Sequence, residues 1–299
     1  MPSITVPARR LIGTRAEGLA LVLFTACSWG ITWPTTKFML TMLPPYSVRA
    51  VSGVIGCGLA LGIAVLRGEK LWPPRDQWGR IILYAMLNFG LFIVLTVHAI
   101  ALLRASEAVT ITYTIPVWAV LLSWPLLGER PTALKLLALA LALGGVALLV
   151  GADTAEARWD KAFPAGLALA AAICFGLGTV LATKRPLRLP PTVSVFWQAL
   201  FGIAVVIAFA VPEHRDWDKV TGLGWFGLIY IAVVPLTLAY VAWFRALKLV
   251  SASTASTTVL ISPMVGVIGS GFMLHETFGL RQIVALAMTL SGVALASRR

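Results

Sequence analysis

The chain contains two copies of one segment, and this internal repeat constrains its architecture more than any other feature of the sequence. The tract from Trp29 to Lys37 returns as the tract from Phe175 to Lys184, which is longer by one residue. The end of the unit repeats at an offset of 147 residues, in the pairs Ser106 and Ser253, Pro116 and Pro263, Gly128-Glu129 and His275-Glu276, and Gly145-Val146-Ala147 and Gly292-Val293-Ala294. Because shared Pro, Glu and Lys at a fixed offset rarely arise by chance, we predict two structurally equivalent halves.

The composition places both halves in a membrane. Hydrophobic residues make up 59% of the chain, charged residues only 12%, and the mean hydropathy is +0.90, whereas a soluble domain carries about 25% charged residues. A helix needs about 20 apolar residues to cross a bilayer, and hydropathy predicts ten such spans. They lie at 17–39, 46–67, 80–102, 106–127, 132–151, 163–182, 192–211, 222–244, 251–273 and 279–297.

The predicted fold is an all-α integral membrane protein of ten transmembrane helices. Five spans form a first repeat over 17–151, and five form a second over 163–297. Since five is odd, the second copy enters the bilayer upside down. Inverted repeats of this kind are typical of carriers that work by alternating access around a central cavity. Two fused repeats complete one pathway, so we expect a functional monomer.

The net charge of +12 follows from this topology and does not indicate nucleic-acid binding. With ten spans, both termini share one side of the membrane, and that side holds 16 of the 24 Lys and Arg but only four acids. The opposite side holds eight bases and eight acids, which cancel. The positive-inside rule places the basic side in the cytoplasm. We therefore expect both termini there, in a cell (inner) membrane.

Cofactor and metal motifs are missing from the sequence. The three cysteines, Cys27, Cys57 and Cys174, fall inside spans and have neither disulfide nor metal-ligand spacing. The loop acids are scattered, without the paired carboxylates by which membrane transferases hold metal and phosphate, and no His/Glu protease motif occurs. We expect no cofactor and no enzymatic activity. An integral-membrane enzyme or a channel is the alternative from a different class.

Charged residues are nearly absent from the span centres, where they would mark function. Glu129 precedes Pro131 and is expected to satisfy free N–H groups at the start of the fifth helix, with Glu276 in the equivalent place before the tenth. Lys37 and Lys184 end the first and sixth helices, where a lysine can reach the interface. A gate or a contact with a substrate carboxylate is the alternative for these lysines.

His98 lies within a span, towards its outer end. Histidine titrates near physiological pH, so His98 is a candidate for carrying a proton. The interpretation that we favour is a neutral imidazole hydrogen-bonded to a neighbouring helix.

Two prolines are candidate hinges. Proline inside a helix frees the carbonyl four residues earlier, so Pro116 frees Thr112 and Pro263 frees Val259 at matching depths of the two halves. Interrupted helices at corresponding places in inverted repeats are a sequence indication of a transport site.

Aromatic residues supply the remaining surface of the predicted site. They combine with two polar side chains to form a mostly apolar pocket, as small-molecule sites usually do. Such a pocket suits a small amphipathic molecule, and it suits a sugar phosphate or dicarboxylate poorly, because those require clustered Arg or Lys. The candidate substrate-binding residues are Trp29, Asn88, Phe92, Tyr113, Phe175, Tyr240, Trp243 and Ser262.

The repeated tracts resemble the EamA repeat of the drug/metabolite transporter superfamily. The resemblance rests on Trp29-Gly30 with Lys37, on Ser106 through Pro116-Val117 to Gly128-Glu129-Arg130, on Gly144-Gly145-Val146, and on the second copy from Phe175-Gly176 to Gly292-Val293. It covers about 17–297 and implies ten helices, cytoplasmic termini and a central cavity. The second copy departs at His275, where the pattern has Gly, and at Phe175, where it has Trp. Tyr113 before Pro116 and the pair Tyr240 and Trp243 are most similar to YddG-type exporters of aromatic and neutral amino acids.

Together these features predict an inner-membrane carrier that exports small amphipathic metabolites, neutral or aromatic amino acids first. An exporter of drug-like or nucleobase-type metabolites is the alternative within the same class. The expected partners are the small-molecule substrate and the lipid bilayer.

Overall fold

The computed structural model describes residues 9–130, 132–150, 155–246, 249–250 and 252–296, and in these segments all regular structure is helical. Among the described residues, seven helices are long and apolar enough to cross a membrane: Arg15–Met39, Pro45–Leu66, Arg75–Leu102, Ala105–Leu127, Asp160–Lys184, Pro191–Ala210 and Gly222–Trp243. Three shorter apolar helices lie at Ala133–Leu149, Ile261–Leu274 and Leu280–Leu295. The chain is therefore a multi-pass helical protein. All ten segments coincide with expected spans, but the number that crosses the bilayer stays a prediction.

The helices follow one another in the same order in both halves. The first half comprises α1 (Arg9–Met39), α2 (Pro45–Leu66), the short η1 (Arg75–Gln77), α3 (Trp78–Ala85), the π-helical turn η2 (Met86–Gly90), α4 (Leu91–Leu102), α5 (Ala105–Thr112), α6 (Ile115–Leu127) and α7 (Ala133–Val150). The second comprises α8 (Ala155–Lys184), α9 (Pro191–Ala210), the short η3 (Trp217–Lys219), α10 (Gly222–Val233), the π-helical turn η4 (Val234–Leu238), α11 (Ala239–Ala246), α12 (Ala252–Val259), α13 (Ile261–Leu274) and α14 (Leu280–Ala296).

Equivalent sequence gives equivalent local structure. Both halves carry a π-helical turn in their third helix, η2 and η4. Both also break the next helix, between α5 and α6 and between α12 and α13, and the bounds of α5 and α12 lie 147 residues apart. The repeat seen in the sequence is thus also a repeat of helix irregularities. The inverted orientation of the second copy stays a prediction.

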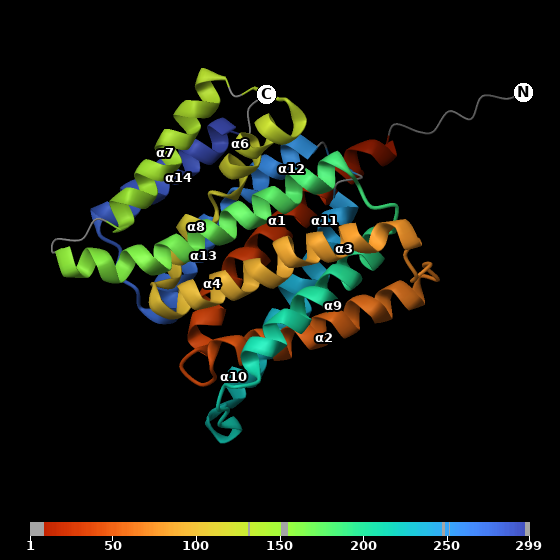
Figure 1. Ribbon diagram of the computed structural model, residues 1–299, viewed down its shortest axis with the longest axis horizontal. Helices are drawn as coiled ribbons and strands as arrows, with labels where there is room; N and C mark the ends of the chain where they lie inside the picture. Colours follow the sequence, from red (N-terminus) through yellow and green to blue (C-terminus); the bar gives the residue numbers. More distant parts are fainter. Residues whose placement is uncertain (1–8, 131, 151–154, 247–248, 251, 297–299) are drawn as a thin grey trace, which may run out of the picture.

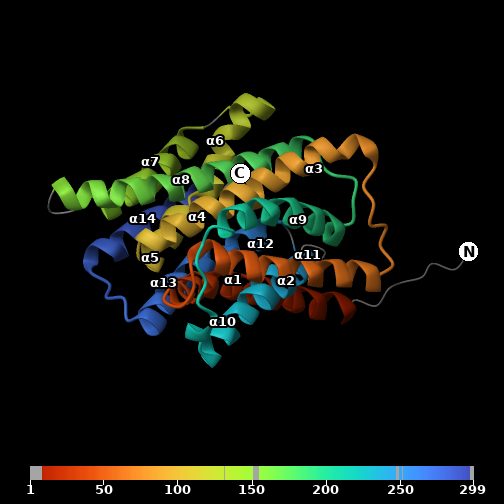
Figure 2. The same cartoon turned by 60° about the horizontal axis from the view of Figure 1, so that its bottom comes forward.

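The long first helix of each half packs against the other half (Figure 1). Helix α1 contacts α11, α12 and α13, while α8 contacts α4, α5 and α6. We call these two sets the α1 group and the α8 group. At the two edges, α7 pairs with α14 and α2 with α9, as Figure 1 and Figure 2 show. The halves are therefore interlocked and not simply side by side.

Two glycines allow the first helix of each half to pack closely against the other half. A Cβ on Gly30 of α1 would lie 2.5 Å from the carbonyl oxygen of Ser262 in α13. A Cβ on Gly176 of α8 would lie 3.3 Å from the carbonyl oxygen of Ile115 in α6. Small residues let helix backbones approach closely in membranes. Because Ile115 and Ser262 are 147 residues apart, the two crossings are equivalent.

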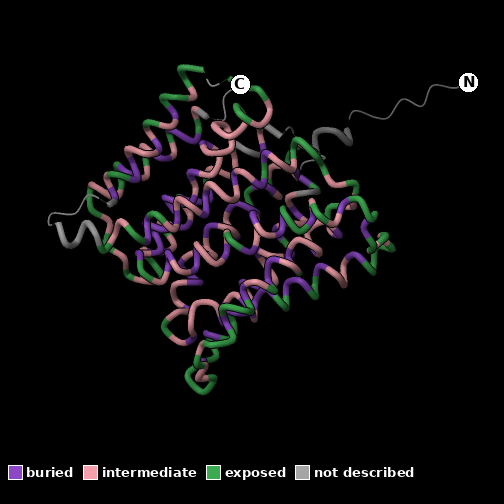
Figure 3. Tube along the Cα trace, viewed as in Figure 1, coloured by how far each residue is buried: buried purple, intermediate pink, exposed green. Residues whose placement is uncertain are grey.

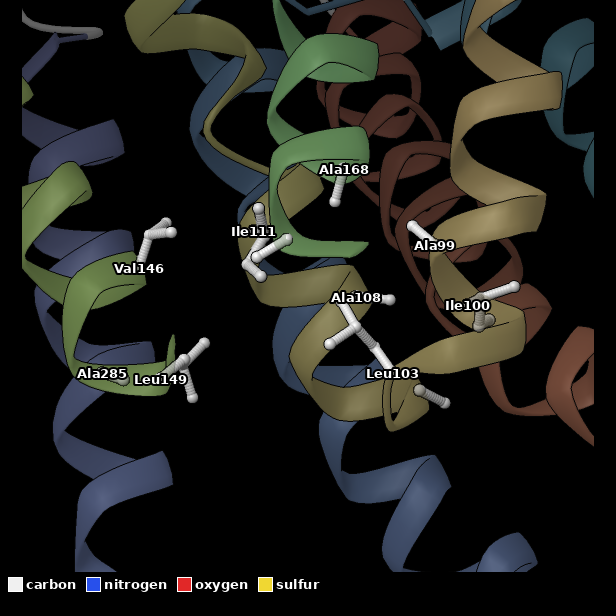
Figure 4. Close-up of a cluster of buried hydrophobic side chains, with 11 residues drawn as sticks. Ala99, Ile100, Leu103, Ala108, Ile111, Val146, Leu149, Ala168 and Ala285 are labelled. Carbon is white, nitrogen blue, oxygen red and sulfur yellow. The ribbon is translucent and has the colours of Figure 1, made fainter. Parts of the chain in front are cut away.

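Buried residues fill the interior and exposed ones cover the periphery (Figure 3). A large cluster joins α4, α5, α7, α8 and α14, and it consists of alanines and larger aliphatic side chains, among them Ile100, Ile111 and Leu149 (Figure 4). On the periphery, Leu66, Phe272 and Leu280 are 89%, 80% and 78% exposed. Such large exposed apolar side chains fit a surface that faces lipid.

The bundle has a basic end, which we define by the contacts among its charged residues. Arg67, after α2, bonds to Thr192 in α9, and Arg188 pairs with Asp76. Arg67 and Arg245 also line one cavity. The opposite end carries the residues after α1, α4, α9 and α13.

Candidate functional site

A cavity of about 630 Å³ opens among α2, α9 and the segment formed by η4 and α11. Its charged lining residues lie at the basic end, and the lining becomes mostly apolar one to two helical turns further along α2 and α11. It is lined by Ala60, Ile63, Arg67, Glu69, Pro191, Thr192, Val195, Leu236, Thr237, Tyr240, Val241 and Arg245. The cavity thus joins a charged mouth to a wall that accommodates an apolar group.

The mouth contains a carboxylate oxygen without a partner. Oε2 of Glu69 is buried and has no hydrogen bond within the described residues. Helix α2 ends in a turn that aims this residue back at the helix: Gly68 adopts φ +63°, and the N–H of Glu69 bonds to the carbonyl of Ala64 at 3.0 Å. A buried acceptor left unpaired is costly, so the mouth favours a ligand with an N–H or ammonium group.

Two arginines face the same mouth. Arg67 donates to Oγ1 of Thr192 at 3.5 Å, which is a weak and exposed bond. Arg245 forms an ion pair with Glu17 of α1. Guanidinium groups bind carboxylates in two-point fashion, so Arg67 is available for an anionic group.

Three predicted site residues meet behind the cavity wall. The ring of Trp29 lies 5.5 Å from that of Tyr240 and 5.8 Å from that of Trp243. The indole N–H of Trp29 donates to the carbonyl of Pro235 at 3.2 Å. Pro235 lies in η4, so the π-helical turn presents this carbonyl to α1. Of these residues Tyr240 lines the cavity.

Two other pairs of predicted residues lie elsewhere. Hydroxyls of Tyr113 and Ser262 bond to each other at 2.5 Å, and the ring of Trp33 lies 6.5 Å from Tyr113. Rings of Phe92 and Phe175 lie 4.9 Å apart. The eight candidates therefore fall into separate groups of contacts, and their role in binding substrate stays a prediction.

Asn88 lies in η2, and only one of the two polar atoms of its side-chain amide has a hydrogen-bond partner among the described residues. Its Nδ2 donates to Oε1 of Gln198 at 3.4 Å, while its buried Oδ1 has no partner among the described residues. π-Helical turns occur frequently at functional sites. Neither turn, nor Gln198 as a partner, was predicted, because helix periodicity in an apolar span looks the same with or without one extra residue in a turn.

Both candidate hinge prolines follow a helix break. Helix α5 ends at Thr112 and α6 begins at Ile115, so that Pro116 occupies the first turn of α6. In the second half α12 ends at Val259, and α13 begins at Ile261, two residues before Pro263. The hydroxyl of Thr112 is buried without a partner in the described chain. The role of these breaks as hinges stays a prediction.

His98 lies away from the cavity. Its Nδ1 is 3.2 Å from the hydroxyl of Tyr46 on α2, and its ring also contacts Phe163 of α8. The residue thus makes a polar contact between helices. Proton transfer through it stays a prediction.

The expected positions of two glutamates were wrong. Glu276 does not cap the helix that follows it, because its carboxylate accepts from the backbone N–H of Ala105 at 2.8 Å and from the N–H and hydroxyl of Ser106. Arg104 adds an ion pair at 3.6 Å. Glu129 is exposed and makes no hydrogen bond within the described residues. The loop after α13 lies over the other half, so the nearest free N–H groups belong to α5.

A second cap of this kind was missed. Glu213, after α9, accepts from the N–H groups of Tyr46 and Ser47 at 3.0 and 2.7 Å. It therefore holds the start of α2. The sequence showed an acid in a loop, and only the fold brings it to a helix start.

Lys37 makes contacts that the sequence did not predict, and its interfacial role stays a prediction. Its Nζ donates to the carbonyls of Ile100, Ala101 and Leu103 at 2.8, 3.1 and 2.8 Å. The ammonium group thus holds the end of α4. Lys184 is exposed and donates to the carbonyl of Leu126 at 2.6 Å.

Comparison with known families gives one match over almost the whole chain. The EamA-like transporter family matches twice, over residues 16–151 and 163–298. These two matches coincide with the two repeats.

Relatives of similar length include several transporters. The chain is 25% identical to the uncharacterized transporter YvbV of Bacillus subtilis (strain 168), over 93% of this chain and 91% of that one. It is 28% identical to protein PecM of Dickeya dadantii (strain 3937), over 91% and 89%. It is 30% identical to an uncharacterized transporter of Archaeoglobus fulgidus, over 71% and 76%.

A solved crystal structure shares the fold. It superposes with a TM-score of 0.62 at 21% identity and covers 94% of this chain and 96% of its own.

Proposed function

The chain belongs to the EamA-like transporter family and is therefore a membrane transporter and not an enzyme; from this premise we propose that its substrates are small amphipathic metabolites, neutral and aromatic amino acids first. We further propose that it is a monomer of ten transmembrane helices in two inverted repeats. It would lie in a bacterial inner membrane with both termini in the cytoplasm and export substrate by alternating access, as YddG-type exporters do.

The observation that carries the substrate class is the cavity mouth. An α-amino acid presents an ammonium group, a carboxylate and a side chain from one carbon atom. The unpartnered Oε2 of Glu69 suits the ammonium group, and the weakly bonded Arg67 suits the carboxylate. The apolar wall that ends at Tyr240 suits the side chain.

We infer the direction of transport from the end at which the cavity opens. Its mouth lies at the basic end, which the positive-inside rule assigns to the cytoplasm. Loading from the cytoplasm is what an exporter requires. Release then needs the two groups of helices to rock so that the cavity opens at the opposite end.

A second substrate class is favoured by the aromatic residues. Tyr240 presents its ring at the cavity wall, with the rings of Trp29 and Trp243 packed behind it, and flat ring systems stack well on such surfaces. Drug-like or nucleobase-type molecules are therefore the alternative cargo.

Counterflow in proteoliposomes tests the substrate class. Vesicles loaded with unlabelled Phe, Met or Thr should accumulate the same labelled amino acid, and uptake should saturate. Glu69→Gln should lower this uptake about tenfold because it removes the charge partner of the ammonium group, whereas Asp218→Asn in an exposed loop should not. Counterflow of nucleobases or a cationic dye without amino acids would support the alternative cargo. Flux that neither saturates nor exchanges would indicate a channel.

Topology is tested independently with reporters. A tag in the loop after Asp218 should be reached from outside intact cells, and tags on both termini should be protected, because the basic end faces the cytoplasm. Placing the tag there leaves the cap made by Glu213 intact. Protection of the loop tag would contradict the inverted ten-span arrangement.

A further inference from the structure

Two charged residues tie the α1 group to the α8 group at the end opposite the cavity mouth. Lys37, near the end of α1, donates to the carbonyls of Ile100, Ala101 and Leu103 at the end of α4. Glu276, directly after α13, accepts from the first N–H groups of α5. Both charged side chains belong to the α1 group, and the main-chain groups that they meet belong to the α8 group.

The charges suit the helix ends that they meet. A helix leaves its first N–H groups and its last carbonyls without partners, and its dipole favours an anion at the start and a cation at the end. Glu276 meets a start, and Lys37 meets an end. Ser106 adds its hydroxyl to the carboxylate.

The repeat places a second such pair at the basic end. Lys184 and Glu129 lie 147 residues from Lys37 and Glu276. Lys184 lies at the end of α8, and Glu129 lies in the loop after α6, so the α8 group carries both residues. Their charges would reach towards the α1 group. The recipients are repeated as well: α12 has the bounds of α5 shifted by 147 residues, and Val250 is the counterpart of Leu103.

In this conformation the second pair is not engaged. Lys184 donates to Leu126 of its own group, and Glu129 is exposed without a hydrogen bond in the described part of the chain. The cavity opens at this same end of the bundle. One end is thus tied by its Lys and Glu, while the cavity opens at the other end, where the equivalent pair is not engaged.

We infer that the two pairs are alternating latches of the transport cycle. The outer latch, Lys37 with Glu276, holds the cavity open to the cytoplasm. The inner latch, Lys184 with Glu129, closes on the carbonyl of Val250 and the start of α12 when the outer latch releases. This inference rests on the alternating access proposed above, and it names the residues that set the balance between the two orientations. Most of the recipients are main-chain groups, and at the outer latch the hydroxyl of Ser106 and the guanidinium group of Arg104 also contact Glu276.

Accessibility of engineered cysteines measures the balance without any substrate. In a background with Cys27→Ala, Cys57→Ala and Cys174→Ala, Val241→Cys reports on the cavity that faces the cytoplasm. Val94→Cys, its counterpart 147 residues earlier in α4, reports on the opposite opening. A membrane-impermeant maleimide is applied to one side at a time. With both latches intact, we expect fast labelling of the first reporter from inside and slow labelling of the second from outside.

Loss of the outer latch should reverse this pattern. Lys37→Met or Glu276→Ala should raise labelling of Val94→Cys from outside about tenfold and slow the labelling of Val241→Cys, a change in population of about 1.4 kcal/mol. The matched controls, Lys184→Met and Glu129→Ala, should move labelling in the other direction. Unchanged rates in folded Lys37→Met protein would refute the latch.

A cross-link covers the case in which Glu276→Ala does not fold. With Ser106→Cys and Glu276→Cys joined by a short bifunctional thiol reagent, the outward reporter should stay protected until the link is reduced. Labelling of that reporter while the link is intact would refute the latch. If labelling shifts as expected but no amino acid shows counterflow, then the proposed substrate is wrong and the latch stands.

Discussion

Gly30→Leu is expected to disrupt the packing of the α1 group. A Cβ at this position would lie 2.5 Å from the carbonyl oxygen of Ser262 and 2.8 Å from Cβ of Val265. Backbone and β-carbon atoms cannot move aside as a flexible side chain can, so α1 and α13 must separate. Overpacking of this kind costs about 3 kcal/mol or more. The measurement is the melting temperature of the purified protein in detergent, together with the monodisperse fraction in size exclusion.

Glycines elsewhere provide the control for this substitution. Gly58 and Gly62, both in α2, have no atom within 4 Å of the position that a Cβ would occupy. Gly58→Ala and Gly62→Ala should leave the melting temperature unchanged or raise it, since Ala favours a helix over Gly by about 0.5–1 kcal/mol. A melting temperature for Gly30→Leu equal to that of these controls would show that the close crossing does not stabilise the fold.

Tyr240→Ala is expected to lower transport at least tenfold while leaving the protein folded. Tyr240 closes the apolar wall of the cavity and packs on Trp29. Removing the ring loses the burial of an apolar substrate group, worth about 1.5 kcal/mol or more. Initial rates of counterflow at low substrate concentration measure the loss, and the melting temperature reports folding.

Two variants separate the role of the ring from a general effect of losing an aromatic residue. Tyr240→Phe keeps the ring and should keep most of the transport. Trp225→Ala removes an aromatic residue that stacks on Trp217 outside the cavity, at a centroid distance of 5.9 Å, and should not change transport. Full transport by Tyr240→Ala would mean that substrate binds elsewhere.

Helix positions could be predicted from the sequence with errors of a few residues. The expected span 46–67 corresponds to α2, which begins at Pro45 and ends before the left-handed Gly68. Proline at a helix start and glycine after a helix end are local signals, and hydropathy is a sum over neighbouring residues. Both kinds of information are present in any short window of the chain.

The contents of the site were harder to predict. The contact of Trp29 with Tyr240 joins residues that the repeat already singled out as aromatic. In the sequence, Arg67, Glu69 and Arg245 are only three of the many charges at or near the ends of predicted spans. They line the cavity because α2 and α11 end beside each other, and that proximity depends on long-range packing.

The sequence by itself determined the family, the helical class, the two equivalent halves and the residue types at the helix ends. The tertiary structure decided which helix each of these residues contacts: Glu276 caps α5 in the other half, and Lys37 holds the end of α4. It also decided which pair of these charged residues contacts the other group of helices. Lys37 and Glu276 recur in the sequence as Lys184 and Glu129, so the sequence does not distinguish the two pairs. Only the packing of the helices does, because it brings Lys37 and Glu276 to helix ends of the α8 group and leaves Lys184 and Glu129 without contacts of this kind.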